Sequence, residues 1–162
     1  MTERISAIFG TEEQAEAAVQ ELRRLELSDN KIAIVTRHSG GHHPAQEVET
    51  GLIAGAGLGA IFGLAAFLIP GVGPFITAGS LVPVLVNVAG GAAAGAIAGT
   101  AGGLLESALE RAGFEKDEAK YYAGHLAEGA HLVVADIDPH SYSPDEIRAL
   151  FARAGGLGIT ED

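Results

Sequence analysis

The sequence contains no cysteine and no tryptophan, and it has few basic residues. Without cysteine there is no disulfide bond, no zinc site built on thiolates and no cysteine nucleophile, which fits a cytoplasmic protein. Only 10 lysines and arginines stand against 21 acidic residues, and the formal net charge is −11. Nucleic-acid phosphates need Lys and Arg, so we expect no nucleic-acid partner, and anionic lipid headgroups would also be repelled.

Charge is missing altogether from one long stretch, because no residue between Glu49 and Glu106 is charged. All acidic and basic side chains therefore lie in the two flanks. The N-terminus has no long apolar core and runs into an acidic helix, which is not the pattern of a signal peptide. We expect residues 1–50 and 106–162 to form the two halves of one α/β domain, with residues 51–105 as a hydrophobic insert.

Glycine recurs at every fourth position twice within this insert. That spacing puts the glycines on one face of a helix and leaves a groove in which a second helix packs closely. The stretch 70–83, rich in proline and glycine, separates the two series and suits a turn. The insert is thus predicted to be a glycine-zipper helical hairpin, with helix-packing residues Gly51, Gly55, Gly59, Gly63, Gly91, Gly95, Gly99 and Gly103.

The first flank is predicted to fold as a strand, a helix and a strand. Residues 5–9 are a short apolar run, and residues 31–37 enclose a second one that suits a strand buried on both faces. Between the runs, Thr11 and Gln14 have the spacing of a capping box, so we expect a helix over residues 12–25.

The second flank repeats the pattern with one additional helix. We expect a helix over residues 115–128, a strand at 131–137 and a short last strand at 157–160. Ser143 as the capping residue and Pro144 at the first helical position predict a further helix that reaches about Arg153.

Together the flanks predict an α+β fold. Two β-α-β halves around an antiparallel sheet give a ferredoxin-like α/β sandwich, with the glycine-zipper hairpin inserted between the halves. The helix at 115–128 would return the chain from the hairpin to the sheet.

This order of parts resembles a bacterial family, the general stress protein 17M-like or heat-induced stress protein YflT-type domain proteins. The resemblance is carried by Ile-Ala-Ile-Val-Thr-Arg at 32–37, the corner Ile-Pro-Gly-Val-Gly-Pro at 69–74, Glu-Ala-Lys-Tyr-Tyr at 118–122 and Leu-Val-Val at 132–134. It implies a component of the general stress response, and it supplies no catalytic residue or cofactor.

Residues 55–60 match a loose dinucleotide-binding fingerprint. That fingerprint needs a preceding strand and an acidic residue about 20 positions further on. After residue 60 the first acidic residue is Glu106, which is too far away. The four-residue glycine repeat explains these glycines better, so we expect no nucleotide cofactor.

A histidine-containing loop is the candidate for a metal site. His38, His42 and His43 lie near Glu47 and Glu49, and imidazoles with a carboxylate are ligands for Zn²⁺. The spacing matches no closed zinc pattern, so we favour a polar loop without metal.

The second flank supplies the remaining candidates for acid–base or nucleophilic chemistry, which are His125, His131, His140, Asp136, Asp138, Ser141 and Ser143. Nothing in their spacing selects a His/Asp pair, and the serines lack the glycines of a nucleophile elbow. Tyr121 and Tyr122 point about 100° apart on a helix, so we expect one to be packed and the other exposed. The sequence therefore predicts a protein without enzymatic activity.

Two settings remain for the hairpin. A helix over residues 51–69 would be about 28 Å long, close to the ~30 Å hydrocarbon thickness of a bilayer. The second arm, at 90–103, is almost wholly glycine and alanine and offers little large apolar surface, and Asn87 lies near its start. The long uncharged run favours insertion, whereas the missing aromatic anchors do not.

We therefore expect a protein at the cytoplasmic membrane, with its flanks in the cytoplasm and with homo-oligomers formed through the zippers. The alternative is a cytoplasmic homo-oligomeric scaffold in which the hairpins of several chains bury one another. A metal-dependent enzyme that uses His38, His42 and His43 is a third interpretation.

Overall fold

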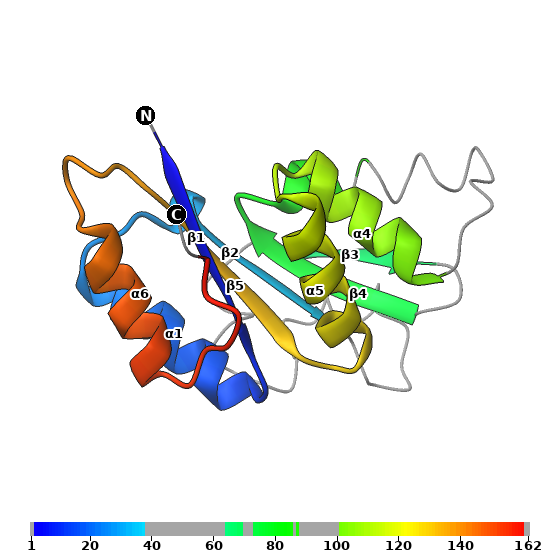
Figure 1. The fold of residues 1–162 in the computed structure, drawn as a ribbon, viewed down its shortest axis with the longest axis horizontal. Coiled ribbons are helices and arrows are strands. Elements are labelled where there is room, and N and C mark those ends of the chain that lie inside the picture. The colour runs from blue at the N-terminus through cyan, green and yellow to red at the C-terminus, as the bar shows by residue number, and fades with distance from the viewer. Residues whose placement is uncertain (1, 38–63, 70–72, 86, 88–100, 161–162) are drawn as a thin grey trace.

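The computed structural model describes residues 2–37, 64–69, 73–85, 87 and 101–160. It is a mixed α/β domain with one antiparallel sheet of five strands in the order β1-β5-β2-β4-β3 (Figure 1). The strands are β1 (Glu3–Phe9), β2 (Ile32–Arg37), β3 (Leu64–Ile69), β4 (Gly73–Gly79) and β5 (His131–Ile137). The helices are α1 (Glu12–Arg24), the 3-10 turn η1 (Asp29–Lys31), α4 (Ala101–Arg111), α5 (Lys116–Ala127) and α6 (Pro144–Arg153).

Most elements of the two flanks lie where their local signals predict them, whereas α4 extends to Arg111 over residues for which no helix is predicted. α1 starts after Thr11, whose side chain accepts a hydrogen bond from the Gln14 backbone N–H at 3.3 Å. α5 is the predicted helix at 115–128, and it is capped by reciprocal bonds between Glu115 and Glu118. Gly129 follows it with φ 100°, a conformation that favours glycine.

The two flanks share one sheet. β5 lies between β1 and β2 and is antiparallel to both, with Ile5 opposite Ala135 and Ala33 opposite Val134. β1 and β2 therefore run parallel to each other, joined by α1. Residues 157–160 lie along the outer edge of β1, where they form a single β-bridge between Ile8 and Leu157 in place of the predicted full strand.

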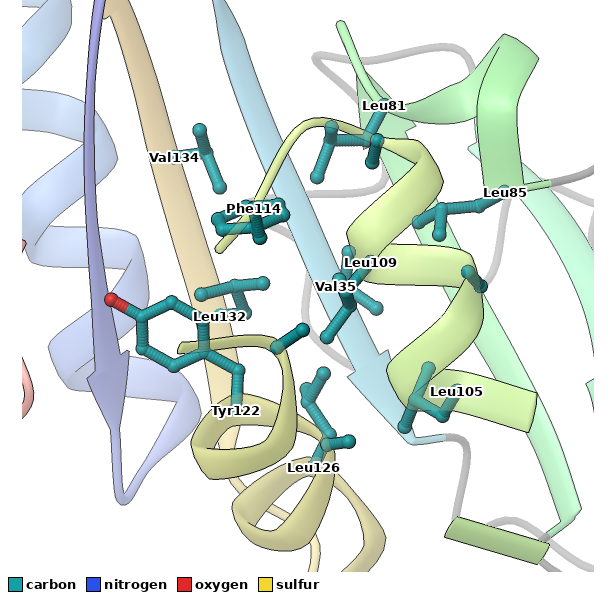
Figure 2. Packing of buried hydrophobic residues seen from close by; sticks show 14 of the residues in the cluster. Val35, Leu81, Leu85, Leu105, Leu109, Phe114, Tyr122, Leu126, Leu132 and Val134 are labelled. Carbon is teal, nitrogen blue, oxygen red and sulfur yellow. The ribbon is translucent and has the colours of Figure 1, made fainter. Parts of the chain in front are cut away.

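Helices cover both faces of the sheet and create two cores. On one face, α1 and α6 pack over β1 and β5, and the rings of Phe9 and Phe151 meet edge to face at 5.8 Å. On the other face, α4 and α5 place Leu105, Leu109 and Tyr122 against β2, β4 and β5 (Figure 2). A strand that contributes side chains to both cores is buried on both faces, and β2 is such a strand, as its apolar run predicts.

The main departure from expectation lies in the uncharged insert. The prediction of helix for residues 64–69 is wrong: these residues form β3, which pairs antiparallel with β4. β4 pairs with β2 through Val35 opposite Thr77, and Phe75 is completely buried. The sequence did not distinguish the two states, because an apolar run without polar alternation fits a sheet covered by helices as well as it fits a helix. Pairing within the sheet decides for the strand.

Of the eight zipper glycines, only Gly103 lies within the described residues. It is half-buried in the first turns of α4. Gly51, Gly55, Gly59, Gly63, Gly91, Gly95 and Gly99 lie outside the described residues, so their predicted pairing stays a prediction. Within the part of the chain that the structure describes, no helix has both the length and the apolar character needed to cross a membrane.

Candidate functional site

A hollow lies between the N-terminal end of α5 and the C-terminal segment at 157–160. Its volume is about 720 Å³. It is lined by Glu115, Asp117, Glu118, Tyr121, Tyr122, Gly158, Ile159 and Thr160. Three carboxylates and two phenol groups line it, so we take this hollow as the candidate site.

Three residues that line the hollow form a hydrogen-bonded group with the buried Ser6. We call this group the Tyr122 cluster: Ser6, Tyr122, Gly158 and Thr160. The Tyr122 hydroxyl donates to the Gly158 carbonyl oxygen at 2.7 Å and lies 3.0 Å from Ser6 Oγ. Ser6 Oγ also lies 2.6 Å from Thr160 Oγ1. Figure 2 shows the Tyr122 hydroxyl oxygen directed toward β1, where Ser6 lies. The cluster joins α5, β1 and the C-terminal segment.

Tyr121 covers the same segment from the solvent side. Its side chain is 40% exposed, whereas Tyr122 is 1% exposed, so the expected division between one packed and one exposed tyrosine is confirmed. Gly158 has φ +56°, and a Cβ there would lie 2.2 Å from the Tyr121 ring. Only glycine therefore allows Tyr121 to lie this close to the C-terminal segment.

The chemistry available to the Tyr122 cluster is limited. Burial raises the pKa of Tyr122 above its ordinary value of 10.0, so its hydroxyl stays protonated at neutral pH. The hydrogen-bond partners of Ser6 Oγ are the hydroxyls of Tyr122 and Thr160, and neither takes up a proton at that pH. The arrangement suits holding residues 157–160 against β1.

Two of the three carboxylates of the hollow are engaged in helix capping. The Glu115 backbone N–H donates to the Glu118 carboxylate at 3.3 Å, and the Glu115 side chain accepts from the Glu118 backbone. Among the described residues, no three or more His, Asp or Glu side chains lie together in a way that could hold a metal ion.

A second polar group joins β1 to the loop after α4. Arg4 forms an ion pair with Asp136 at 2.7 Å, donates to the Ala112 carbonyl oxygen and stacks over the Phe114 ring, with its guanidinium carbon 5.3 Å from the ring centre. Asp136, a candidate acid or base in the sequence, is thus paired with a permanent cation. Sequence reasoning missed Arg4 because its partners are 108 and 132 positions away.

The remaining candidates from the second flank do not meet. His125 lies against Tyr121, with ring centres 4.5 Å apart, whereas Nδ1 of His131 is 2.7 Å from Thr36 Oγ1. The backbone N–H of His140 donates to the Asp138 carboxylate at 3.0 Å, which forms a turn. No His/Asp pair forms among these residues.

The structure describes the two candidate serines but not the histidine loop. Ser143 is the N-cap residue of α6, as predicted, and its side chain makes no capping hydrogen bond. The Ser141 backbone N–H donates to the Asp138 carbonyl oxygen at 2.9 Å in the preceding turn. His38, His42, His43 and the glycines at 55–60 lie outside the described residues.

No protein family, curated protein or solved structure matches this chain. The resemblance to bacterial stress proteins therefore stays a prediction from the residues that carry it. What the chain does has to be argued from its own fold and surface.

The Tyr122 cluster makes a direct prediction for stability. Replacing Tyr122 with phenylalanine keeps the ring but leaves the Gly158 carbonyl oxygen without its donor, so we expect the free energy of unfolding to fall by about 1–3 kcal/mol. The matched control is Tyr121→Phe on the adjacent exposed ring, for which we expect a change within about 0.5 kcal/mol. Urea unfolding measures both variants, and equal effects would show that the cluster does not hold the C-terminal segment.

His131 predicts a pH dependence of stability. Burial lowers the pKa of His131 from its ordinary value of 6.5, and the nearby Glu13 carboxylate opposes part of this shift. The unfolded chain then binds the proton more readily, so stability contributed by neutral His131 is present above pH 6.5 and is lost as the pH falls below it. We expect the thermal midpoint to fall less between pH 7.5 and 5.5 in His131→Asn than in the parent protein. His140→Asn, at an exposed turn, is the control, and an unchanged slope in His131→Asn would contradict this account.

Proposed function

We propose that this chain is a non-enzymatic bacterial stress-response protein that acts by associating with copies of itself through its uncharged insert. The observation that carries the proposal is the place of β3 and β4. β4 pairs with β2, and β3 pairs with β4, so both strands belong to the same sheet as the flanks. The insert is then an extension of the α/β domain, available for contacts between copies.

The topology of the flanks supports a ferredoxin-like sandwich as the core of this domain. β1, α1 and β2 form one split β-α-β unit. β5, α6 and residues 157–160 form the second, with residues 157–160 beside β1. In our proposal β4 and β3 extend this sandwich on the β2 side, and α4 and α5 cover the face opposite α1 and α6.

The lengths that remain in the insert favour self-association over a spanning hairpin. With residues 64–69 in the sheet, residues 51–63 would make a helix of only about 20 Å, against the ~30 Å of a hydrocarbon core. A helix between the buried Leu85 and the start of α4 at Ala101 would likewise be only about 22 Å long.

The distribution of charge also favours contact at the insert. Two copies that each carry a net charge of −11 repel one another over most of their surface. Residues 50–105 carry no charge, so a contact formed there brings no like charges together. We therefore place the contact between copies in this part of the chain.

The experiment is size determination by light scattering without detergent, run together with alkaline carbonate extraction of cell membranes. We expect a defined oligomer that carbonate releases completely. A monomer over the micromolar range would refute self-association. As a test of the zippers, Gly59→Leu with Gly95→Leu is expected to reduce the mass of the oligomer.

Membrane association at the cytoplasmic face is the second candidate. The observation that favours it is the uncharged run between Glu49 and Glu106. Protein that stays in the membrane after carbonate treatment and needs detergent for extraction would support this candidate over the first.

A further inference from the structure

The two edges of the sheet are protected to different degrees. At the β1 edge, the Ile8 N–H donates to the Leu157 carbonyl oxygen at 2.9 Å, and the Leu157 N–H returns a bond to Ile8 at 2.8 Å. The Thr160 N–H also donates to the Ser6 carbonyl oxygen at 3.1 Å. At the opposite end, β3 pairs with β4 on one side, and no other described strand pairs with it.

We propose that β3 is the strand through which a second copy of this chain binds. The two β3 strands would pair antiparallel across a two-fold axis and join two sheets into one. This inference rests on the proposed self-association and names one surface of the insert that takes part in it.

The register identifies which backbone groups of β3 are available. Antiparallel pairs alternate between those that exchange two hydrogen bonds and those that exchange none. Leu68 lies opposite Pro74, which has no N–H, so this pair cannot be of the hydrogen-bonded kind. By alternation, the N–H and C=O groups of Leu64, Ala66 and Leu68 point away from β4.

An independent hydrogen bond supports this assignment. Ser80, like Pro74, has an even residue number, so its backbone groups point to the same side of β4. Its N–H donates to the Ile32 carbonyl oxygen of β2 at 3.2 Å. The even-numbered residues of β4 therefore direct their backbone groups to β2, and the odd-numbered ones direct theirs to β3.

The sequence of β3 lacks the features that normally protect an edge. Leu-Ala-Ala-Phe-Leu-Ile has no charged residue and no proline, the two common ways of preventing strand addition. The β1 edge, by contrast, carries Glu3 and Arg4 in addition to its covering segment. Strand addition is thus expected at β3.

A second copy is the occupant that fits this edge best. An antiparallel strand is complementary to itself, so the same surface serves both partners of a two-fold dimer. A basic partner would be drawn to the acidic flanks and would gain no charge contact at β3. Two copies of a chain with a net charge of −11 meet here without bringing charges together.

The first test removes one outward N–H. Ala66→Pro deletes a donor that the proposed dimer needs and that β4 does not use, whereas the control Ala66→Val keeps the donor. Light scattering should show half the parent mass for Ala66→Pro and the parent mass for Ala66→Val. Circular dichroism and the urea midpoint confirm that both variants are folded.

The outcomes separate the two proposals. A monomeric parent protein refutes the proposed function and this inference together. An oligomeric parent whose mass is unchanged by Ala66→Pro refutes only the role of β3.

The second test needs no substitution and therefore decides the question even if Ala66→Pro fails to fold. Residue-resolved hydrogen exchange of the parent protein is compared between high concentration and dilution to monomer. We expect the amides of Leu64, Ala66 and Leu68 to exchange at least tenfold faster after dilution, while those of Ala65 and Phe67 change little. Protection of all five that is independent of concentration would overturn the inference.

Discussion

Replacing Phe75 with alanine is expected to lower the free energy of unfolding of the whole domain by about 3–5 kcal/mol, the usual cost of emptying a core site of this size. Phe75 lies on β4 and is completely buried in the core that also contains Val35, Leu109 and Leu132. Those residues belong to β2, α4 and β5, so the ring joins the insert to both flanks. Its removal should therefore weaken every part of the sheet.

Urea unfolding followed by circular dichroism measures this effect. Leu157→Ala is the control, because Leu157 is 61% exposed and its truncation should cost less than about 1 kcal/mol. If the insert folded as a separate helical hairpin, Phe75→Ala would leave the stability of the flanks unchanged, and that result would contradict the fold described above.

Gly79→Ala is expected to destabilise the protein by more than about 2 kcal/mol, since a left-handed backbone and a steric clash act together. Gly79 ends β4 with φ +81°, and a Cβ there would lie 1.7 Å from the Ile32 carbonyl oxygen. Alanine would force β4 away from β2 at this point.

Gly124→Ala is the matched control in the same chain. Gly124 lies inside α5, and a Cβ there would meet nothing within 4 Å. Alanine in a helix interior should stabilise the protein by about 0.5–1 kcal/mol. Thermal unfolding of the two variants should thus shift in opposite directions. Equal shifts would mean that the approach of β4 to β2 is not as close as the structure shows.

The flanks were predictable because their signals are local and specific. The Thr11 cap, Gly129 and Pro144 each mark a helix end with a particular backbone requirement, and the structure places the helix ends beside them. The alternation of buried residues on β5 between the two cores follows from a strand covered on both sides.

The insert was not predictable to the same degree. The run at 64–69 has no polar residue to set a period of two or of 3.6, so its hydrophobicity fits strand and helix equally. Pro74 suggested a turn, but proline is also tolerated near the start of a strand, and that is where it lies in β4. β3 is a strand because it pairs with β4, and β4 in turn pairs with β2, a contact that the sequence does not encode locally.

The Tyr122 cluster could likewise not be predicted from the sequence, because its contacts join residues far apart in the chain. The adjacent tyrosines predicted one buried ring, but nothing local indicated that its hydroxyl would meet Ser6, which lies 116 positions earlier in the chain. Gly158 gives no sequence signal either, because its requirement for glycine comes from the Tyr121 ring above it.

The central claim is that β3 and β4 of the uncharged insert belong to the flank sheet, and a designed disulfide tests it most directly. Val35 lies opposite Thr77, and the alternation of pairs makes this a pair without backbone hydrogen bonds, where Cβ atoms are closest. The chain has no cysteine of its own. Val35→Cys with Thr77→Cys should therefore form an intramolecular disulfide on oxidative refolding, detected by mass spectrometry. Val35→Cys with Ala78→Cys, whose second thiol faces the other side of the sheet, should not. A folded Val35→Cys/Thr77→Cys protein without the disulfide, or equal cross-linking of both pairs, would contradict the account.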